Sequence, residues 1–227
     1  MFRTLFDLQR PNEFARFRIV FRPIGDIGAD GLEVENSFVV AVIGYRPPGG
    51  NGAEVDFVSV GAYTKDTIVT RAGTRYVDGG GYSYSAHAAR LADISVGAVT
   101  RLAAADRKST DLLRSVGVEV IVHESKHSTL MRLEYPTDNV DERILTVAAV
   151  ADAFVPADVA SIEAGAILIS PSIRGEVPLA VVEAVRAKAG RVGLDVQGFV
   201  RIRTENGQLA YEAWPEIRQV VALVDVL

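Results

Sequence analysis

The order of apolar and polar segments along residues 54–227 predicts strands separated by helices. Short apolar runs of the kind found in buried strands occupy residues 54–62, 94–102, 164–171 and 191–198. Apolar residues recur at helical spacing in residues 81–93, 104–116 and 176–190. Gly117 and Gly190 stand near the ends of the last two helices, where glycine commonly stops a helix. Such alternation is typical of βαβ units, so we expect an α/β fold with a mostly parallel sheet.

Additional strand-like segments interrupt this alternation. Residues 66–78 alternate in polarity around a turn at Ala72–Gly73, which predicts a hairpin. Three further strand-like segments follow one another without a helix, at 118–125, 128–136 and 142–150. We expect the segments at 66–77 and 119–150 to form a small β-layer over one edge of the α/β core. The closing run VVALVDVL, residues 220–227, predicts a final buried strand.

The first 53 residues follow a different pattern. They contain two strand-like runs, at 15–25 and 37–46, with no lysine and no clear helix. They end in RPPGGNGA, a proline- and glycine-rich stretch that is typical of a linker. We therefore divide the chain into an N-terminal extension of unknown role, 1–53, and a folded domain, 54–227.

Composition excludes several classes of protein. The 227 residues are 48% hydrophobic and 23% charged, which suits a globular domain with a sizeable core. A net charge of −5 argues against a protein that binds nucleic acid mainly through its phosphates. The absence of cysteine rules out disulfides and a cysteine nucleophile, and favours a cytoplasmic location. No apolar run approaches the roughly 20 residues of a membrane span, so we expect no membrane contact.

The stretch HESKH, residues 123–127, matches the zinc-hydrolase pattern H-E-x-x-H. That pattern holds zinc on a helix, where residues four apart share one face. Here both flanking segments alternate like strands, which favours a polar turn. A zinc hydrolase that uses His123, Glu124 and His127 is therefore a disfavoured alternative.

Three consecutive glycines, Gly79, Gly80 and Gly81, open the predicted helix at 81–93. They match neither the P-loop nor the dinucleotide-binding pattern, and no lysine stands at the P-loop position. Glycines at a helix start let a ligand approach backbone N–H groups. Asp66 follows the first strand, where the carboxyl ends of parallel strands form a ligand crevice. A carboxylate that accepts hydrogen bonds and backbone amides that donate them suit a polyhydroxylated ligand. The alternative is that Asp66 faces solvent and the glycines only form a tight entry into the helix.

Several stretches resemble, in the same order, the N-terminal half of the ribokinase/PfkB sugar kinases. They include VDFVSVGAYTKDTIV, DGGGYSYSAHAARLA, SVGAVTRL, LLRSVGVEVIV and ILISPSIRGEVPLAVVEAVRAKAGRVGLDVQGFVR, and the likeness runs to EAWPEIRQVVALVDVL. The resemblance covers about residues 54–227. It implies a partial ribokinase-like three-layer sandwich with a mostly parallel sheet. The strands at about 66–77 and 119–150 would then form a small β-lid over the substrate, through which such proteins often form homodimers.

The resemblance also implies a substrate site. The family's G-x-x-x-x-D corresponds to Gly61 and Asp66, whose carboxylate would bind substrate hydroxyls. Gly79 and Gly80, followed here by Gly81, correspond to a di-glycine beneath the sugar. Tyr84 stands where asparagine is usual, so the expected ligand is a sugar, a polyol or a nucleoside.

The activity that the resemblance implies is ATP-dependent phosphorylation of a hydroxyl, with ATP and Mg²⁺ as cofactors. Asp195 and Gln197 correspond loosely to the region near the transferred phosphate. The family's N-x-x-E and G-A-G-D motifs, which serve magnesium, phosphate and the catalytic base, do not follow. The stretch PIGDIGADG at 23–31 imitates the second motif but lacks the helix that should come after it.

We therefore expect no catalytic residue in this chain and a catalytically incomplete polypeptide. It would be a fragment, a frameshift product or a natural truncation of a kinase. The alternative is a non-catalytic remnant that binds a ligand or another protein.

Overall fold

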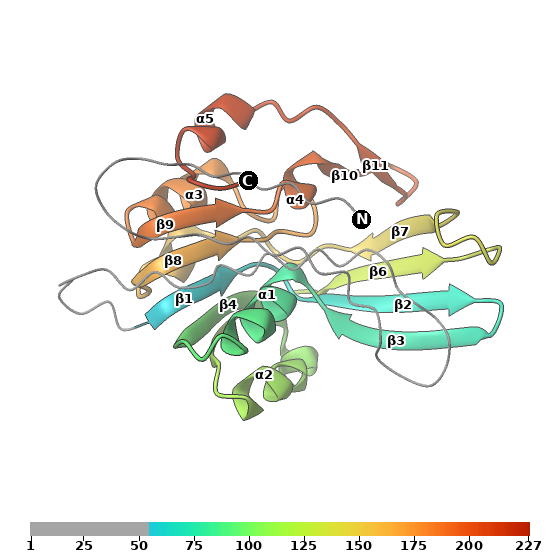
Figure 1. The fold of residues 1–227 in the computed structure, drawn as a ribbon. Coiled ribbons are helices and arrows are strands. Elements are labelled where there is room, and N and C mark those ends of the chain that lie inside the picture. The colour runs from blue at the N-terminus through green and yellow to red at the C-terminus, as the bar shows by residue number, and fades with distance from the viewer. Residues whose placement is uncertain (1–54) are drawn as a thin grey trace, which may run out of the picture.

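The structure is a computed structural model that describes residues 55–227. The expected extension at 1–53, with its two strand-like runs, lies outside the described residues. Within them, two larger β-sheets meet end to end near the middle of the molecule, with helices on the faces of one of them (Figure 1).

The larger sheet has five strands, all parallel, as the α/β pattern predicts. They are β1 (Val55–Val60), β4 (Val96–Ala103), β5 (Glu119–Ser125), β8 (Ala164–Ile169) and β9 (Ala189–Leu194). Their spatial order is β5-β4-β1-β8-β9. The chain therefore moves outward from β1 to one edge and then continues from β8 to the other. The strand order reverses between β1 and β8, and ligands of open α/β sheets bind outside the carboxyl ends at such a point.

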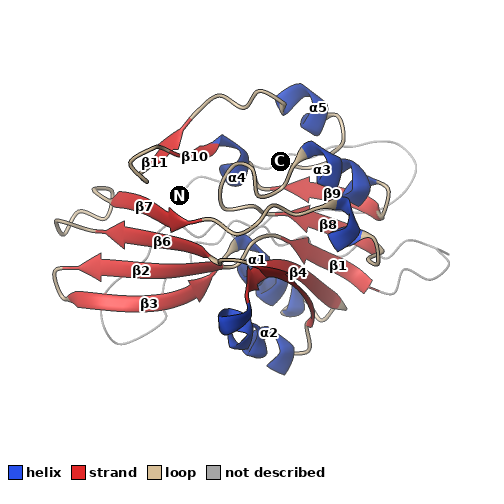
Figure 2. Ribbon diagram, turned by 180° about the vertical axis from the view of Figure 1, so that it is seen from behind, coloured by secondary structure: helices blue, strands red, loops and turns tan. Residues whose placement is uncertain are grey.

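Helices cover both faces of this sheet and give the expected three-layer sandwich. They are α1 (Gly81–Arg90), η1 (Ala104–Thr110), α2 (Asp111–Ser115), η2 (Pro156–Val159), α3 (Leu179–Arg186), α4 (Gln197–Val200) and α5 (Ile217–Val221). Figure 2 shows α1 and α2 on one face and α3 on the other. Tyr82 of α1 and Leu113 of α2 belong to one buried cluster, whereas Val181 and Val185 of α3 belong to a second. The α/β prediction is confirmed.

The second sheet has four strands in the order β3-β2-β6-β7. They are β2 (Thr64–Thr70), β3 (Gly73–Gly79), β6 (Thr129–Glu134) and β7 (Ile144–Ala149). The structure thus contains the predicted hairpin, with β2 antiparallel to β3. One part of the expected β-layer is wrong: Glu119–Ser125 forms β5 and pairs with β4 in the parallel sheet. Alternation alone could not place it, because Val120 and Val122 suit either sheet equally well.

The C-terminal region contains a small hairpin, β10 (Arg201–Arg203) with β11 (Leu209–Tyr211), and then α5. The predicted final strand is wrong, because Val220 and Val221 belong to α5 and only Val226 makes a strand-like bridge, to Gly193. The carboxylate of Asp225 holds this end by accepting hydrogen bonds from Arg186, Arg191 and the Val192 amide.

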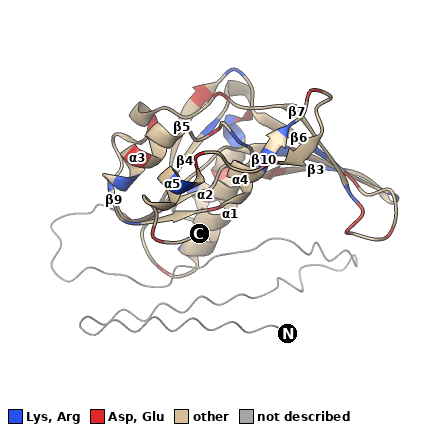
Figure 3. Cartoon of the chain, turned by 90° about the horizontal axis from the view of Figure 1, so that it is seen from above, with Lys and Arg blue, Asp and Glu red and all other residues tan. Residues whose placement is uncertain are grey.

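Charged residues of both signs are interspersed along the ribbon (Figure 3). In the part of the chain that the structure describes, no helix is both long and apolar enough to cross a membrane.

Candidate substrate site

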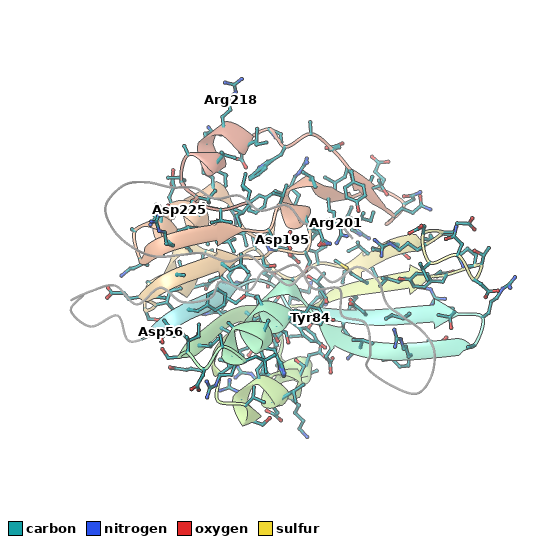
Figure 4. All side chains as sticks on the ribbon, in the orientation of Figure 1. Asp56, Tyr84, Asp195, Arg201, Arg218 and Asp225 are labelled. Atoms are coloured by element: carbon teal, nitrogen blue, oxygen red, sulfur yellow. The ribbon has the colours of Figure 1, made fainter. Side chains whose placement is uncertain are left out.

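The candidate site lies where the strand order reverses. Gly61 follows β1 and Ser170 follows β8, and a Cβ on Gly61 would overlap the Ser170 carbonyl oxygen. From this junction the chain continues into β2, which carries Asp66, and it returns through β3 to the three glycines. Sheet topology therefore brings the residues predicted from sequence to one place. Figure 4 shows Tyr84 and Asp195 near the junction of the two sheets, with Asp56 at the far end of the parallel sheet.

The three glycines serve three different purposes. Gly80 has φ +107°, which side-chain-bearing residues rarely adopt, and a Cβ there would overlap the Ala62 carbonyl oxygen. A Cβ on Gly81 would overlap the Ser170 hydroxyl. Only a Cβ on Gly79 would point at a group of polar oxygens, those of Tyr84, Thr64 and Asp66. Of the three, Gly79 is therefore the glycine that leaves space beside those oxygens.

Three oxygens converge on that space. A Cβ on Gly79 would lie 3.0 Å from the Tyr84 hydroxyl, 3.1 Å from the Thr64 hydroxyl and 3.3 Å from Asp66 Oδ2. Thr64 and Asp66 reach it together because residues two apart on β2 share one face, and the register sets Thr64 opposite Gly79. Thr64 was not predicted from sequence; its signal is a polar residue at the start of the strand that carries Asp66.

Asp66 is the group in this cluster whose ionisation is most perturbed. Burial raises its pKa to about 6, a hydrogen bond with Thr64 opposes the shift, and the nearby Asp78 charge adds to it. Its Oδ1 atom is buried and has no hydrogen-bond partner among the described residues. A buried acceptor without a donor is costly, and a bound ligand is one way to satisfy it.

Tyr84 extends from the first turn of α1 and is 48% exposed. Burial of its hydroxyl end and the Asp66 charge raise its pKa, and the positive charge of Arg75 lowers it. The side chain thus has a polar tip beside Asp66 and a ring that is partly open to solvent. Such a residue can donate a hydrogen bond to a ligand and also pack on an apolar ring face.

Asp195 and Gln197 follow β9 at the same carboxyl edge of the sheet. Asp195 accepts hydrogen bonds from the Ser170 hydroxyl, at 3.3 Å, and from the backbone N–H of Gln197, at 2.9 Å. The two residues are therefore linked to the glycine segment through Ser170, which packs against Gly81. Ser170 was not predicted as a site residue; its signal is a polar residue directly after a buried strand.

A buried carboxylate fixes the parallel sheet to the four-stranded one. Glu176 is 1% exposed and accepts hydrogen bonds from the Thr129 hydroxyl at 2.7 Å and from the Ser172 and Ile173 amides at 2.7 and 3.2 Å. Burial raises its pKa, which those three bonds oppose. Thr129 begins β6 and pairs with Thr64, so this network sets the position of the strand beside the site.

The zinc interpretation of HESKH is wrong for a geometric reason. His123 and Glu124 are successive residues of β5, so their side chains point to opposite faces, and His127 lies beyond the strand end. His123 instead contacts Asp158, whose carboxylate pairs with Arg101 at 2.8 Å. Among residues 55–227, no three His, Cys, Asp or Glu side chains are grouped to hold a metal ion.

Comparisons with known proteins agree with this geometry. No protein-family model matches the sequence, and no curated protein matches it. The fold is similar to a sulfate complex of a pyrophosphate-dependent kinase in the ribokinase family, with 30% identity and a TM-score of 0.69 over 74% of this chain and 60% of that one. A structure of such a kinase with a pyrophosphate analog and myo-inositol gives 28% identity, a TM-score of 0.68 and coverage of 75% and 60%.

A more distant match shows the fold alone. Ribokinase of Arabidopsis thaliana, complexed with ribose and ATP, has 17% identity and a TM-score of 0.51 over 76% of this chain and 59% of that one. The chain thus spans about three fifths of the length of each of these kinases. The sheet order, the glycine segment and these likenesses together confirm the resemblance seen in the sequence: over about three quarters of its length, this chain has a ribokinase-like fold and is similar to kinases of the ribokinase family.

Proposed function

We propose that this chain binds a hydroxylated small molecule, a sugar, polyol or nucleoside, as the substrate-binding part of a small-molecule kinase. The observation that carries the proposal is the carboxylate of Asp66: its Oδ2 lies with two hydroxyls over Gly79, and its buried Oδ1 has no partner among the described residues. A substrate hydroxyl that donates to Asp66 would satisfy this oxygen. The Thr64 and Tyr84 hydroxyls can each donate or accept a second bond to the same ligand.

The neighbouring kinases support the choice of ligand class. The structure at 28% identity is complexed with myo-inositol, and the more distant ribokinase is complexed with ribose; both ligands carry adjacent hydroxyls. We therefore propose a polyol as the first ligand to test. The four-stranded sheet, which carries Asp66 and Thr64, would act as the lid that excludes water from it.

The phosphoryl donor follows from the same comparison and is also a proposal. Family resemblance implies ATP with Mg²⁺, whereas the neighbours at 28 and 30% identity are described as pyrophosphate-dependent. Asp195 and Ser170, at the carboxyl edge of β8 and β9, are the described residues that we place toward the donor. Turnover by the 227-residue chain, assayed with either donor, separates a kinase from a protein that only binds the ligand.

Asp66→Asn is expected to weaken polyol binding by about 10- to 100-fold, because hydrogen bonds to a charged group contribute about 1.5–3 kcal/mol. Isothermal titration calorimetry with myo-inositol and with ribose measures the change. Asp138→Asn is the control, since Asp138 lies in an exposed ion pair with Arg71 at a distance from the site. Equal affinity of wild type and Asp66→Asn for every polyol that binds would contradict the proposal.

Binding is also expected to depend on pH around the Asp66 pKa of about 6. A ligand hydroxyl donates a hydrogen bond to the ionised carboxylate of Asp66, so the affinity reaches its maximum above pH 6. Below that value a proton competes with the ligand, and the dissociation constant rises up to about tenfold for each pH unit. Titrations between pH 5 and 8 should show this slope in wild type and a flat profile in Asp66→Asn; the same slope in both proteins would assign the titration to another group.

A further inference from the structure

Arg75 lies on the same face of the four-stranded sheet as Asp66. In the antiparallel pair of β2 and β3, Asp66 is opposite Val77 and Ile68 is opposite Arg75. Directly opposed residues point to one face, and so do residues two apart on a strand. Asp66, Ile68, Arg75 and Val77 therefore form a single surface that begins at Gly79 and runs outward along the hairpin (Figure 1).

The positive charge of Arg75 is not neutralised by a carboxylate. Arg75 is exposed, and no ion pair involves it within residues 55–227. Two neighbouring arginines differ: Arg71, in the turn between β2 and β3, pairs with Asp138 at 3.1 Å, and Arg132 of β6 pairs with Glu134 at 2.5 Å. Arg75 nevertheless acts on the site, because its charge lowers the pKa of the Tyr84 hydroxyl against the effect of burial.

The spacing defines what a ligand would need. Arg75 is two residues from Val77 on β3, which is roughly 7 Å along the strand. The half-buried residues Ile68 and Val77 occupy the other two positions of this four-residue patch, on the opposite diagonal. A molecule that covers this surface would place hydroxyls at Asp66 and a negatively charged group at Arg75, several ångströms from those hydroxyls. Guanidinium groups bind carboxylates and phosphates through two parallel N–H bonds.

We propose that Arg75 is a specificity-determining residue that selects substrates carrying an anionic group, a carboxylate or a phosphate, beside the hydroxyls bound at Asp66. The inference rests on the proposed function of the same site and narrows its substrate class to acidic polyols. Lysine at this position would keep the charge but not the paired N–H geometry.

Affinity measurements with three probes test this: myo-inositol, D-gluconate and myo-inositol 1-phosphate. Wild type is expected to bind at least one anionic probe tenfold or more tightly than myo-inositol, with the preference reduced by added salt. The better of the two anions tells a carboxylate site from a phosphate site. Arg75→Ala should abolish the preference by weakening the binding of the anionic probes at least tenfold relative to that of myo-inositol, and Arg75→Lys should keep part of the preference.

Arg71→Ala is the matched control, because it removes an arginine from the same hairpin whose charge is already paired with Asp138. It should leave all three affinities unchanged. Binding of myo-inositol through Asp66 without any preference for anions overturns the role of Arg75 and leaves the proposed function standing. The same holds if the preference persists in Arg75→Ala. Failure of all three probes to bind overturns the role of Arg75 together with the choice of a polyol as the ligand.

Discussion

Asp158→Ala is expected to lower the free energy of unfolding by about 3–5 kcal/mol, because it leaves the Arg101 charge buried without its partner. The side chains of this pair are only 12% and 6% exposed, and the guanidinium donates two hydrogen bonds to the carboxylate, at 2.9 and 3.1 Å. The same carboxylate accepts a bond from the Val155 amide and contacts His123. Urea-induced unfolding followed by circular dichroism measures the loss.

Two variants make this prediction specific. Asp138→Ala breaks the Arg71–Asp138 pair, which is 65% and 85% exposed, and should cost less than about 1 kcal/mol. The double variant Arg101→Leu with Asp158→Leu should be more stable than Asp158→Leu alone, because no unpaired charge remains inside. If Asp158→Ala were no less stable than Asp138→Ala, the Arg101–Asp158 pair would contribute nothing to the stability of the fold.

Gly80→Ala is expected to destabilise the protein by about 2–6 kcal/mol, the sum of an unfavourable φ and of displaced neighbours. The new Cβ would overlap the Ala62 carbonyl oxygen and lie 3.2 Å from the Thr64 amide nitrogen. Since Thr64 begins the strand that carries Asp66, polyol affinity should fall together with stability.

Gly73→Ala is the matched control for this second variant. Gly73 also has a positive φ, +143°, but nothing lies within 4 Å of the position its Cβ would take. It should therefore show only the cost of the backbone conformation, about 1–3 kcal/mol, with polyol affinity unchanged. If the two variants unfolded at the same urea concentration, the close approach to Ala62 would be energetically irrelevant.

Sequence patterns predicted the parallel sheet and its helices because each element carries a strong local signal. The Val-rich run of β1 and the helical spacing of Val181, Val182 and Val185 follow directly from burial on one or both faces. The patterns could not assign β5 to a sheet, because the alternation of apolar and polar residues in a strand does not depend on which strand it pairs with. They also could not foresee that Val220 and Val221 end in a short helix, where an apolar run is ambiguous.

The candidate site was only partly accessible from sequence. Asp66 and the glycines could be named because their residue types and their order after a strand have a physical meaning. The different purposes of Gly79, Gly80 and Gly81 could not, because each depends on a neighbour far away in sequence, Ser170 among them. Arg75 was missed for a similar reason: its place beside Asp66 follows from the hairpin register and not from any motif.

The contact between Gly81 and Ser170 has a consequence for the order of folding. Gly61 and Gly81 pack against Ser170, which directly follows β8, and β8 in turn pairs with β1 from Val55↔Ala164 to Val60↔Ile169. Pairings between residues so distant in sequence require large loops to close first, which slows folding. On the ribosome, the site beside Asp66 therefore cannot be completed until β8 has emerged, well after Asp66, Gly79 and Tyr84 have been synthesised.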